Sequence, residues 1–124
     1  MSEKIKVKYR IERSEFIGFI EDCDRVDGVN DIIKIYKKKY YDARQICYGG
    51  IIDEQDIYND DKEPSGTAGF VILNELKKNN IKNKIVIIVR YFGGIKLGKD
   101  GLKNAYSSVT NLILSKYNDC NILE

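Results

Sequence analysis

The amino-acid sequence predicts a two-layer α/β (α+β) domain with the element order ββαβαβα. Near the amino terminus, apolar and polar residues alternate with the period of two that is typical of a half-buried strand. Three later segments space their apolar residues as one face of an amphipathic helix does. Residues 84–90 are the most hydrophobic stretch, which indicates a central strand covered on both faces. We therefore expect a mixed four-stranded sheet with its helices packed on one face.

The first predicted elements are two strands and a helix. Residues 5–11 alternate between apolar and polar, and residues 16–20 are predicted to be a second strand. Asp27 is expected to be the N-cap of a helix that continues to Tyr40. The apolar stripe of this helix consists of Val29, Ile32, Ile33, Tyr36 and Tyr40.

The remaining elements follow in the order strand, helix, strand, helix. Residues 44–52 predict a third strand, and the polar residues 53–63 predict an exposed loop. Residues 68–78 show a second helical stripe, residues 84–90 form the hydrophobic strand, and residues 102–113 carry a third stripe after a glycine-rich connection.

Length and composition favour one ordered domain over residues 1–124. A chain of this size buries roughly two-thirds of the surface that its unfolded form exposes. The chain has one proline, an apolar fraction of 43% and no internal repeat. The longest apolar run, residues 85–89, is far shorter than the ~20 residues that span a bilayer, and residues 1–10 lack the apolar stretch of a signal peptide. We therefore expect a cytoplasmic protein that does not contact a membrane.

The composition excludes several classes of site. The sequence contains no histidine, which excludes catalytic triads and metal centres that need one. Its cysteines are Cys23, Cys47 and Cys120, which are too widely spaced for a CxxC site and are expected to be reduced thiols. The net charge is only +2, yet residues 67–104 hold eight basic and two acidic side chains. Such a segment can steer an anionic partner, although a solvated surface is the simpler interpretation.

The first segment with chemical potential is residues 60–69, where an acidic stretch runs into a small-residue turn and a helix. Backbone N–H groups at a helix N-terminus attract phosphates and carboxylates. Alternatively, Ser65 or Thr67 caps the helix with its hydroxyl group. The carboxylates Asp60, Asp61 and Glu63 could bind a divalent cation, but they lack EF-hand spacing, and a solvated acidic loop is the simpler interpretation.

The second segment is residues 90–102, which has four glycines and joins the hydrophobic strand to the last helix. Its basic side chains can meet phosphates, and Tyr91 and Phe92 can either stack on bases or pack in the core. It matches neither the P-loop nor the dinucleotide-binding pattern. A nucleophile such as Ser65, Thr67 or Cys47 would need Lys, Asp or Glu as its base, and no spacing here favours that arrangement.

These segments resemble the signature of the IMPACT (imprinted and ancient) family, also called the YigZ-like family. The two long matches are EPSGTAG at residues 63–69 and VRYFGGIKLG at residues 89–98. Residues 14–18 are similar to the family's amino-terminal strand, and residues 42–48 to its "DA…HxCYA" strand. The resemblance covers residues 10–117.

The resemblance implies the fold of the fourth domain of elongation factor G and of a ribosomal-protein superfamily. It implies an IMPACT-type amino-terminal domain alone, without the RWD domain of eukaryotic members or the ferredoxin-like carboxy-terminal domain of bacterial ones. Eukaryotic members act in translational control by binding a general-control activator protein. Bacterial relatives are associated with nucleic acid or the translation machinery.

The sequence departs from the family pattern at three positions. Gln45 replaces the usual histidine, so this chain cannot use that position for acid–base chemistry. Lys62 replaces a glycine and adds a positive charge beside the first motif, whereas Asp100 adds a negative charge at the second.

We therefore predict a non-catalytic binding domain in translation regulation. Its expected partners are RNA or the ribosome, a translation-control protein, or a phosphate-type anion, and no cofactor or metal is expected. The alternatives are a protein-interaction regulator without nucleic-acid contact and a hydrolase of phosphorylated or peptide substrates. The predicted binding residues are Glu63, Pro64, Ser65, Gly66, Thr67, Gly69, Arg90, Tyr91, Phe92, Gly93, Gly94, Lys96, Gly98 and Lys99.

Overall fold

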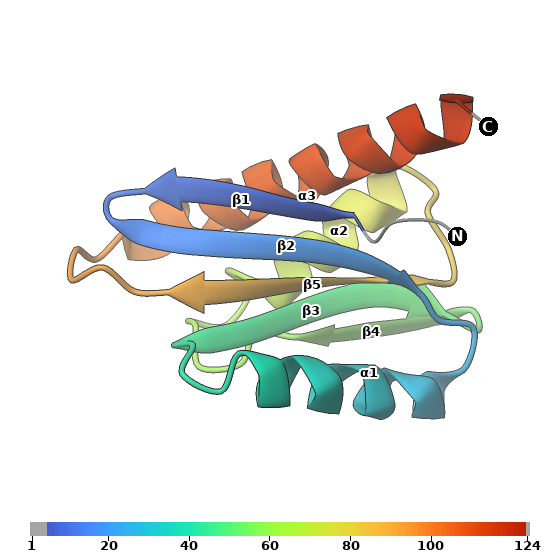
Figure 1. Ribbon diagram of the computed structural model, residues 1–124, viewed down its shortest axis with the longest axis horizontal. Helices are drawn as coiled ribbons and strands as arrows, with labels where there is room; N and C mark the ends of the chain where they lie inside the picture. Colours follow the sequence, from blue (N-terminus) through green and yellow to red (C-terminus); the bar gives the residue numbers. More distant parts are fainter. Residues whose placement is uncertain (1–4, 124) are drawn as a thin grey trace.

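A computed structural model shows one antiparallel five-stranded sheet and three helices in the part of the chain that it describes (Figure 1). The backbone is described for residues 5–123 and the side chains for residues 5–119. The strands are β1 (Lys6–Ile11), β2 (Ser14–Asp22), β3 (Gln45–Ile52), β4 (Gln55–Asn59) and β5 (Lys84–Tyr91). The helices are α1 (Val26–Lys39), α2 (Gly69–Lys78) and α3 (Gly98–Leu123).

The α+β class and all seven expected elements are confirmed, but the predicted sheet is wrong in two respects. Residues 53–63 contain a fifth strand, β4, in place of an exposed loop. The sheet is also antiparallel throughout, in the order β1-β2-β5-β3-β4, and not mixed. β4 was not predicted because it is a short edge strand without an alternating apolar face. All of its residues are exposed except Ile57, which is half-buried.

The expectation that all helices pack on one face is also wrong. α1 covers one face of the sheet, and α2 and α3 cover the other (Figure 1). The central strand β5 serves both layers, because Val86 and Ile88 belong to the cluster under α2 and α3, whereas Ile85, Ile87 and Val89 belong to the cluster under α1. Residues 85–89 are fully buried, which confirms a central strand covered on both faces.

The start of α1 differs from the prediction. Arg25, not Asp27, is the N-cap residue, and it makes no side-chain capping bond. Asp27 lies in the first turn, where its carboxylate accepts a hydrogen bond from Arg25 at 2.9 Å. An acidic side chain there still stabilises the helix through the helix dipole.

Two of the three cysteines lie in the described part of the structure. Cys23 and Cys47 are free and buried, whereas the side chain of Cys120 lies outside the described residues. None of the described helices combines the length and the apolar character that a bilayer-spanning helix needs.

Candidate functional site

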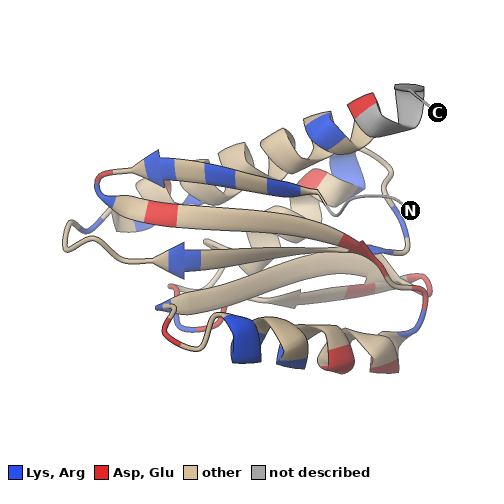
Figure 2. Cartoon of the chain, in the orientation of Figure 1, with Lys and Arg blue, Asp and Glu red and all other residues tan. Residues whose placement is uncertain are grey.

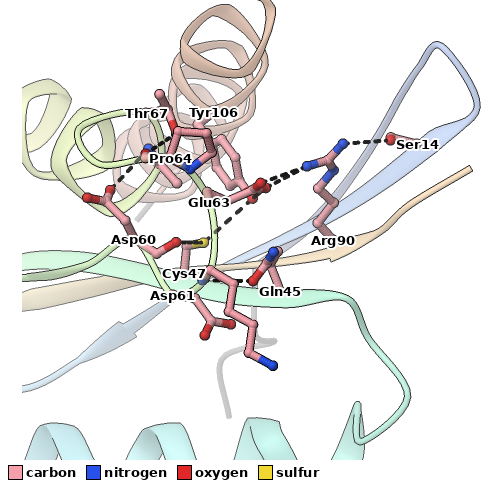
Figure 3. A network of polar contacts seen from close by, with 12 residues as sticks. Ser14, Gln45, Cys47, Asp60, Asp61, Glu63, Pro64, Thr67, Arg90 and Tyr106 are labelled. Carbon is pink, nitrogen blue, oxygen red and sulfur yellow. Dashed lines mark hydrogen bonds and ion pairs between the residues drawn. The ribbon is translucent and has the colours of Figure 1, made fainter. Parts of the chain in front are cut away.

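The two sequence motifs meet in a buried ion pair at one end of the sheet (Figure 3). Glu63 lies in the loop after β4, and Arg90 lies near the end of β5. Nη1 of Arg90 donates hydrogen bonds to both carboxylate oxygens of Glu63, at 2.9 and 2.7 Å. The side chains of Arg90 and Glu63 are only 6% and 4% exposed. Because water is excluded, each charge depends on the other for compensation.

Three further side chains extend this pair into a network. Nη2 of Arg90 donates to the hydroxyl of Ser14 at 3.3 Å, and Tyr106 of α3 donates to Glu63 at 2.6 Å. The thiol of Cys47 lies 3.6 Å from the Tyr106 oxygen. Burial raises the pKa of both the Cys47 thiol and the Tyr106 hydroxyl, so both stay protonated at neutral pH. Cys47 is therefore an inert buried thiol and not an activated nucleophile.

A carboxylate of the chain itself occupies the amino terminus of α2. Asp60 accepts hydrogen bonds from the backbone N–H groups of Gly66, Ala68 and Phe70, at 2.9, 3.1 and 3.1 Å. These are the donors that an external phosphate would need. The carboxylate of Asp60 therefore occupies the place that an external anion would take at the start of α2.

The expectation that Ser65 or Thr67 caps α2 is wrong. The N-cap residue is Ala68, without a side-chain capping bond of its own. Thr67 instead donates its hydroxyl to the carbonyl of Pro64 at 2.6 Å, and Ser65 is exposed. The hydroxyls are displaced from the capping role because Asp60 reaches the same N–H groups from the preceding loop.

The three carboxylates considered as metal ligands have separate partners. Asp60 caps α2, Glu63 pairs with Arg90, and Asp61 accepts a hydrogen bond from the backbone N–H of Ile46 at 2.8 Å. Among the side chains of residues 5–119, no group of three or more His, Cys, Asp or Glu is arranged to hold a metal ion. Gln45 joins this arrangement by accepting from the Lys62 N–H at 2.9 Å, which ties the loop to β3.

The glycines of both motifs allow close backbone packing. A Cβ atom on Gly69 would lie 2.2 Å from the carbonyl oxygen of Asn59 in β4. A Cβ atom on Gly93 would lie 1.9 Å from the carbonyl oxygen of Arg13, in the turn between β1 and β2. Larger residues at either position would push these segments apart.

The second motif divides into an inner and an outer part. Arg90 points inward, and Tyr91, Phe92 and Gly93 are half-buried. The outer part is exposed and consists of Gly94, Ile95, Lys96, Gly98 and Lys99. The first motif divides similarly, with Glu63, Thr67 and Gly69 buried, Gly66 half-buried, and Pro64 and Ser65 exposed.

The predicted residues therefore do not form one binding patch with a common orientation. Glu63 and Arg90 come together as a structural pair, whereas Lys96 and Lys99 face solvent. Ser14 and Tyr106 also belong to the network, although neither is among the predicted binding residues. Tyr106 lies within the apolar stripe of residues 102–113, where its spacing indicates burial and its hydroxyl group gives no separate signal.

Comparisons with known proteins agree with the motifs. Residues 12–114 match the model of the Impact N-terminal domain. IMPACT family member YvyE of Bacillus subtilis is 41% identical over 77% of this chain and 46% of its own length. IMPACT family member YigZ of Escherichia coli is 32% identical over 89% of this chain and 56% of its own length.

More distant relatives and a solved structure extend this similarity. Protein IMPACT of Rattus norvegicus is 30% identical over 84% of this chain and 35% of its own length. A crystal structure of a hypothetical protein has a TM-score of 0.85 and 32% identity, covering 90% of this chain and 57% of that one. The chain thus spans about half the length of the bacterial relatives that it matches.

Proposed function

Because this chain belongs to the family defined by the Impact N-terminal domain, we propose that it is a non-catalytic binding domain in translation regulation that contacts RNA or the ribosome. The binding surface would be the end of the sheet where the two motifs lie. The observation that supports this proposal most is the division of the second motif, whose inner residues hold the fold together while Lys96 and Lys99 remain exposed.

The chemistry of the inner residues argues against catalysis. An acid, base or nucleophile must reach its substrate and exchange protons near the working pH. Glu63 is buried and paired with Arg90 and Tyr106, and burial raises the pKa of the Cys47 thiol. These groups stabilise the domain and are closed to a substrate.

Exposed cations lie on several elements of the molecule. Figure 2 shows Lys and Arg along β1, at the carboxyl end of α1 and beside the loop that leads into α3. On β1, Lys6, Lys8 and Arg10 alternate with inward-facing residues, so they share one face of the sheet. Cations on a common surface attract a phosphate backbone even where the net charge of the chain is small.

Co-sedimentation with ribosomes and with total RNA at increasing salt concentration tests this proposal. We expect retention at low salt that falls steeply as salt rises, because phosphate binding releases counterions. Replacing Lys96 and Lys99 together by Ala should reduce the slope of log affinity against log salt by about 2, roughly one per lost contact.

The matched control is Lys78→Ala. Lys78 is exposed at the far end of α2, away from both motifs, and pairs with Glu75 at 3.5 Å. It should leave the salt slope unchanged. Absence of retention at low salt, or equal effects of the control and the double variant, would contradict the proposal.

A second candidate is a protein-interaction regulator without nucleic-acid contact, and one surface feature favours it. Tyr58 of β4 and Phe70 of α2 are 48% and 41% exposed, and their rings meet edge to face with centroids 5.4 Å apart. Exposed aromatic pairs are common in protein interfaces. This candidate predicts a translation-control protein that stays bound after nuclease treatment and is lost when both aromatic residues become Ser.

A further inference from the structure

A shallow pocket is lined in part by Tyr91 and Phe92 of the second motif. It has a volume of about 390 Å³ and is lined by Asp42, Ala43, Arg44, Tyr91 and Phe92. The first three residues connect α1 to β3, and the last two follow the buried part of β5. The lining thus combines two aromatic rings, a guanidinium group and a carboxylate in one concave surface.

One wall of the pocket is formed by a stacked cation and ring. The guanidinium carbon of Arg44 lies 4.9 Å from the centre of the Phe92 ring, and that of Arg90 lies 5.5 Å from it. Arg90 is held by Glu63, and the Arg44 backbone N–H donates to the Arg90 carbonyl at 2.9 Å. The wall is therefore anchored to the buried network. Unpaired bases stack on such aromatic rings and guanidinium planes.

The other wall presents an oriented carboxylate. Tyr91 donates its hydroxyl to Oδ1 of Asp42 at 2.9 Å, which uses one of about four acceptor positions of that carboxylate. Burial and the bond to Asp42 raise the pKa of Tyr91 to about 12, so Tyr91 remains the donor at neutral pH. The exposed Asp42 can accept further hydrogen bonds from a ligand in the pocket.

This combination selects among nucleobases. Guanine presents two adjacent N–H donors on its Watson–Crick edge, which match the two oxygens of a carboxylate. Uracil presents one N–H between two carbonyl oxygens, and these oxygens would face the carboxylate unfavourably. A nearby phosphate group would meet the exposed Arg44.

We propose that this pocket binds an unpaired guanine base of single-stranded RNA, stacked against Arg44 and Phe92 and hydrogen-bonded to Asp42. This inference rests on the proposed contact of the domain with RNA. It adds a base-specific subsite to a surface that otherwise recognises only phosphate.

Fluorescence anisotropy with labelled oligonucleotides tests the proposal. The two probes are a short oligouridine and the same oligonucleotide with one central guanine. We expect the guanine probe to bind about tenfold more tightly, which corresponds to about 1.4 kcal/mol for one matched base contact. Asp42→Asn should abolish this preference, because the amide retains an acceptor for Tyr91 but presents a donor to guanine. Phe92→Leu keeps an apolar side chain and should weaken binding of the guanine probe about tenfold through the loss of stacking.

The outcomes distinguish this proposal from the broader one. Salt-dependent binding of both probes with equal affinity would overturn the guanine subsite and leave the RNA contact standing. A preference that survives in Asp42→Asn would also overturn the subsite. Failure of both probes to bind at low salt would overturn the RNA contact and the subsite together. Circular dichroism and urea unfolding confirm that each variant folds, and Lys78→Ala should behave as the wild type.

Discussion

At the scale of single residues, the Glu63–Arg90 pair explains why charged residues occur in otherwise well-packed segments. Arg90 follows a run of fully buried residues in β5 and continues inward with only 5% exposure. Such a buried cation is tolerated because Glu63 compensates its charge, and because Glu63 and Ser14 accept hydrogen bonds from Nη1 and Nη2, whereas the buried Nε has no hydrogen-bond partner among the described residues. The pair links the end of β5 to a loop that lies 27 residues earlier in the sequence.

Replacing Glu63 by Gln tests the strength of this link. The variant leaves the Arg90 guanidinium buried without a compensating charge, which costs about 3–5 kcal/mol of unfolding free energy. Urea unfolding measures the loss. The control is Lys77→Ala, which removes an exposed pair with Asp56 at 2.5 Å and should cost less than about 1 kcal/mol. Similar losses in the two variants would show that the buried pair has no special role.

Tyr91 gives a prediction for the dependence of stability on pH. Its pKa in the folded protein, about 12, lies above the ordinary value of 10, so the folded state binds the phenolic proton more tightly. The stabilisation of the folded state that comes from this raised pKa is fully present below pH 10 and is lost as the pH rises towards 12. The wild type should therefore lose stability more steeply than Tyr91→Phe over this interval in urea unfolding experiments. Parallel curves would contradict the shift.

At the scale of elements, α2 is positioned by its amino-terminal end. Asp60 accepts hydrogen bonds from three backbone N–H groups at the start of α2. Gly69, the first residue of α2, has no Cβ atom and can therefore lie against the backbone of β4. Gly49 of β3 gives a second close approach, since a Cβ atom there would lie 2.8 Å from the backbone nitrogen of Leu73 in α2. The signature residues around Gly69 therefore define how a helix docks on a sheet.

Asp60→Ala should destabilise the entry to α2. Loss of a capping carboxylate costs about 0.5–2 kcal/mol, and the amides of Ala68 and Phe70 should exchange with solvent faster. Hydrogen exchange measures these amides directly. Ser65→Ala, which alters an exposed hydroxyl in the same turn, is the control and should change neither quantity appreciably. Unchanged exchange in Asp60→Ala would contradict the capping role.

Two glycine-to-alanine substitutions should act in opposite directions. Gly69→Ala forces a Cβ atom against the Asn59 carbonyl and should cost about 1–3 kcal/mol. Gly28→Ala lies in α1, where the nearest atom to a new Cβ is the Cys23 sulfur at 3.6 Å, an ordinary contact. Alanine favours helix, so this variant should gain up to about 1 kcal/mol. Thermal unfolding compares the two, and a neutral Gly69→Ala would refute the close approach.

At the scale of the whole molecule, β5 holds two cores together. The strand pairs with β2 and β3 and supplies side chains to the clusters on both faces of the sheet. The outer strands β1 and β4 each pair with a single neighbour. Their polar residues suit an edge, where charges discourage pairing with other chains.

Native-state hydrogen exchange should reflect this arrangement. Amides in the centre of β5 should exchange only through global unfolding, whereas those of β4 should exchange through smaller local openings. The difference in protection should therefore vanish in strongly destabilising urea, where global unfolding dominates for both strands. Equal protection of β4 and β5 without denaturant would contradict the arrangement.

Most of the fold followed from local patterns, whereas most of the site did not. The three helices and the strands β1, β2, β3 and β5 have apolar periodicities that are visible within a short window of sequence. The sequence did not reveal which face of the sheet each helix covers. The apolar run of residues 85–89 indicates that both faces of the strand are covered, but it does not assign a helix to either face. The capping of α2 by Asp60 was also not predicted, because Asp60 lies in the preceding loop and is not adjacent in sequence to the first turn of the helix.

The sequence by itself determined the family, the order of the main elements and the absence of histidine chemistry, since these depend on residue identity and short-range spacing. Only the tertiary structure decided which motif residues face inward. Glu63, Arg90 and Tyr106 come from a loop, a strand and a helix that are far apart in the sequence, and their charges and hydroxyls are satisfied only when those segments meet. A buried charge needs a partner at hydrogen-bond distance, and that requirement is met in space and not along the chain.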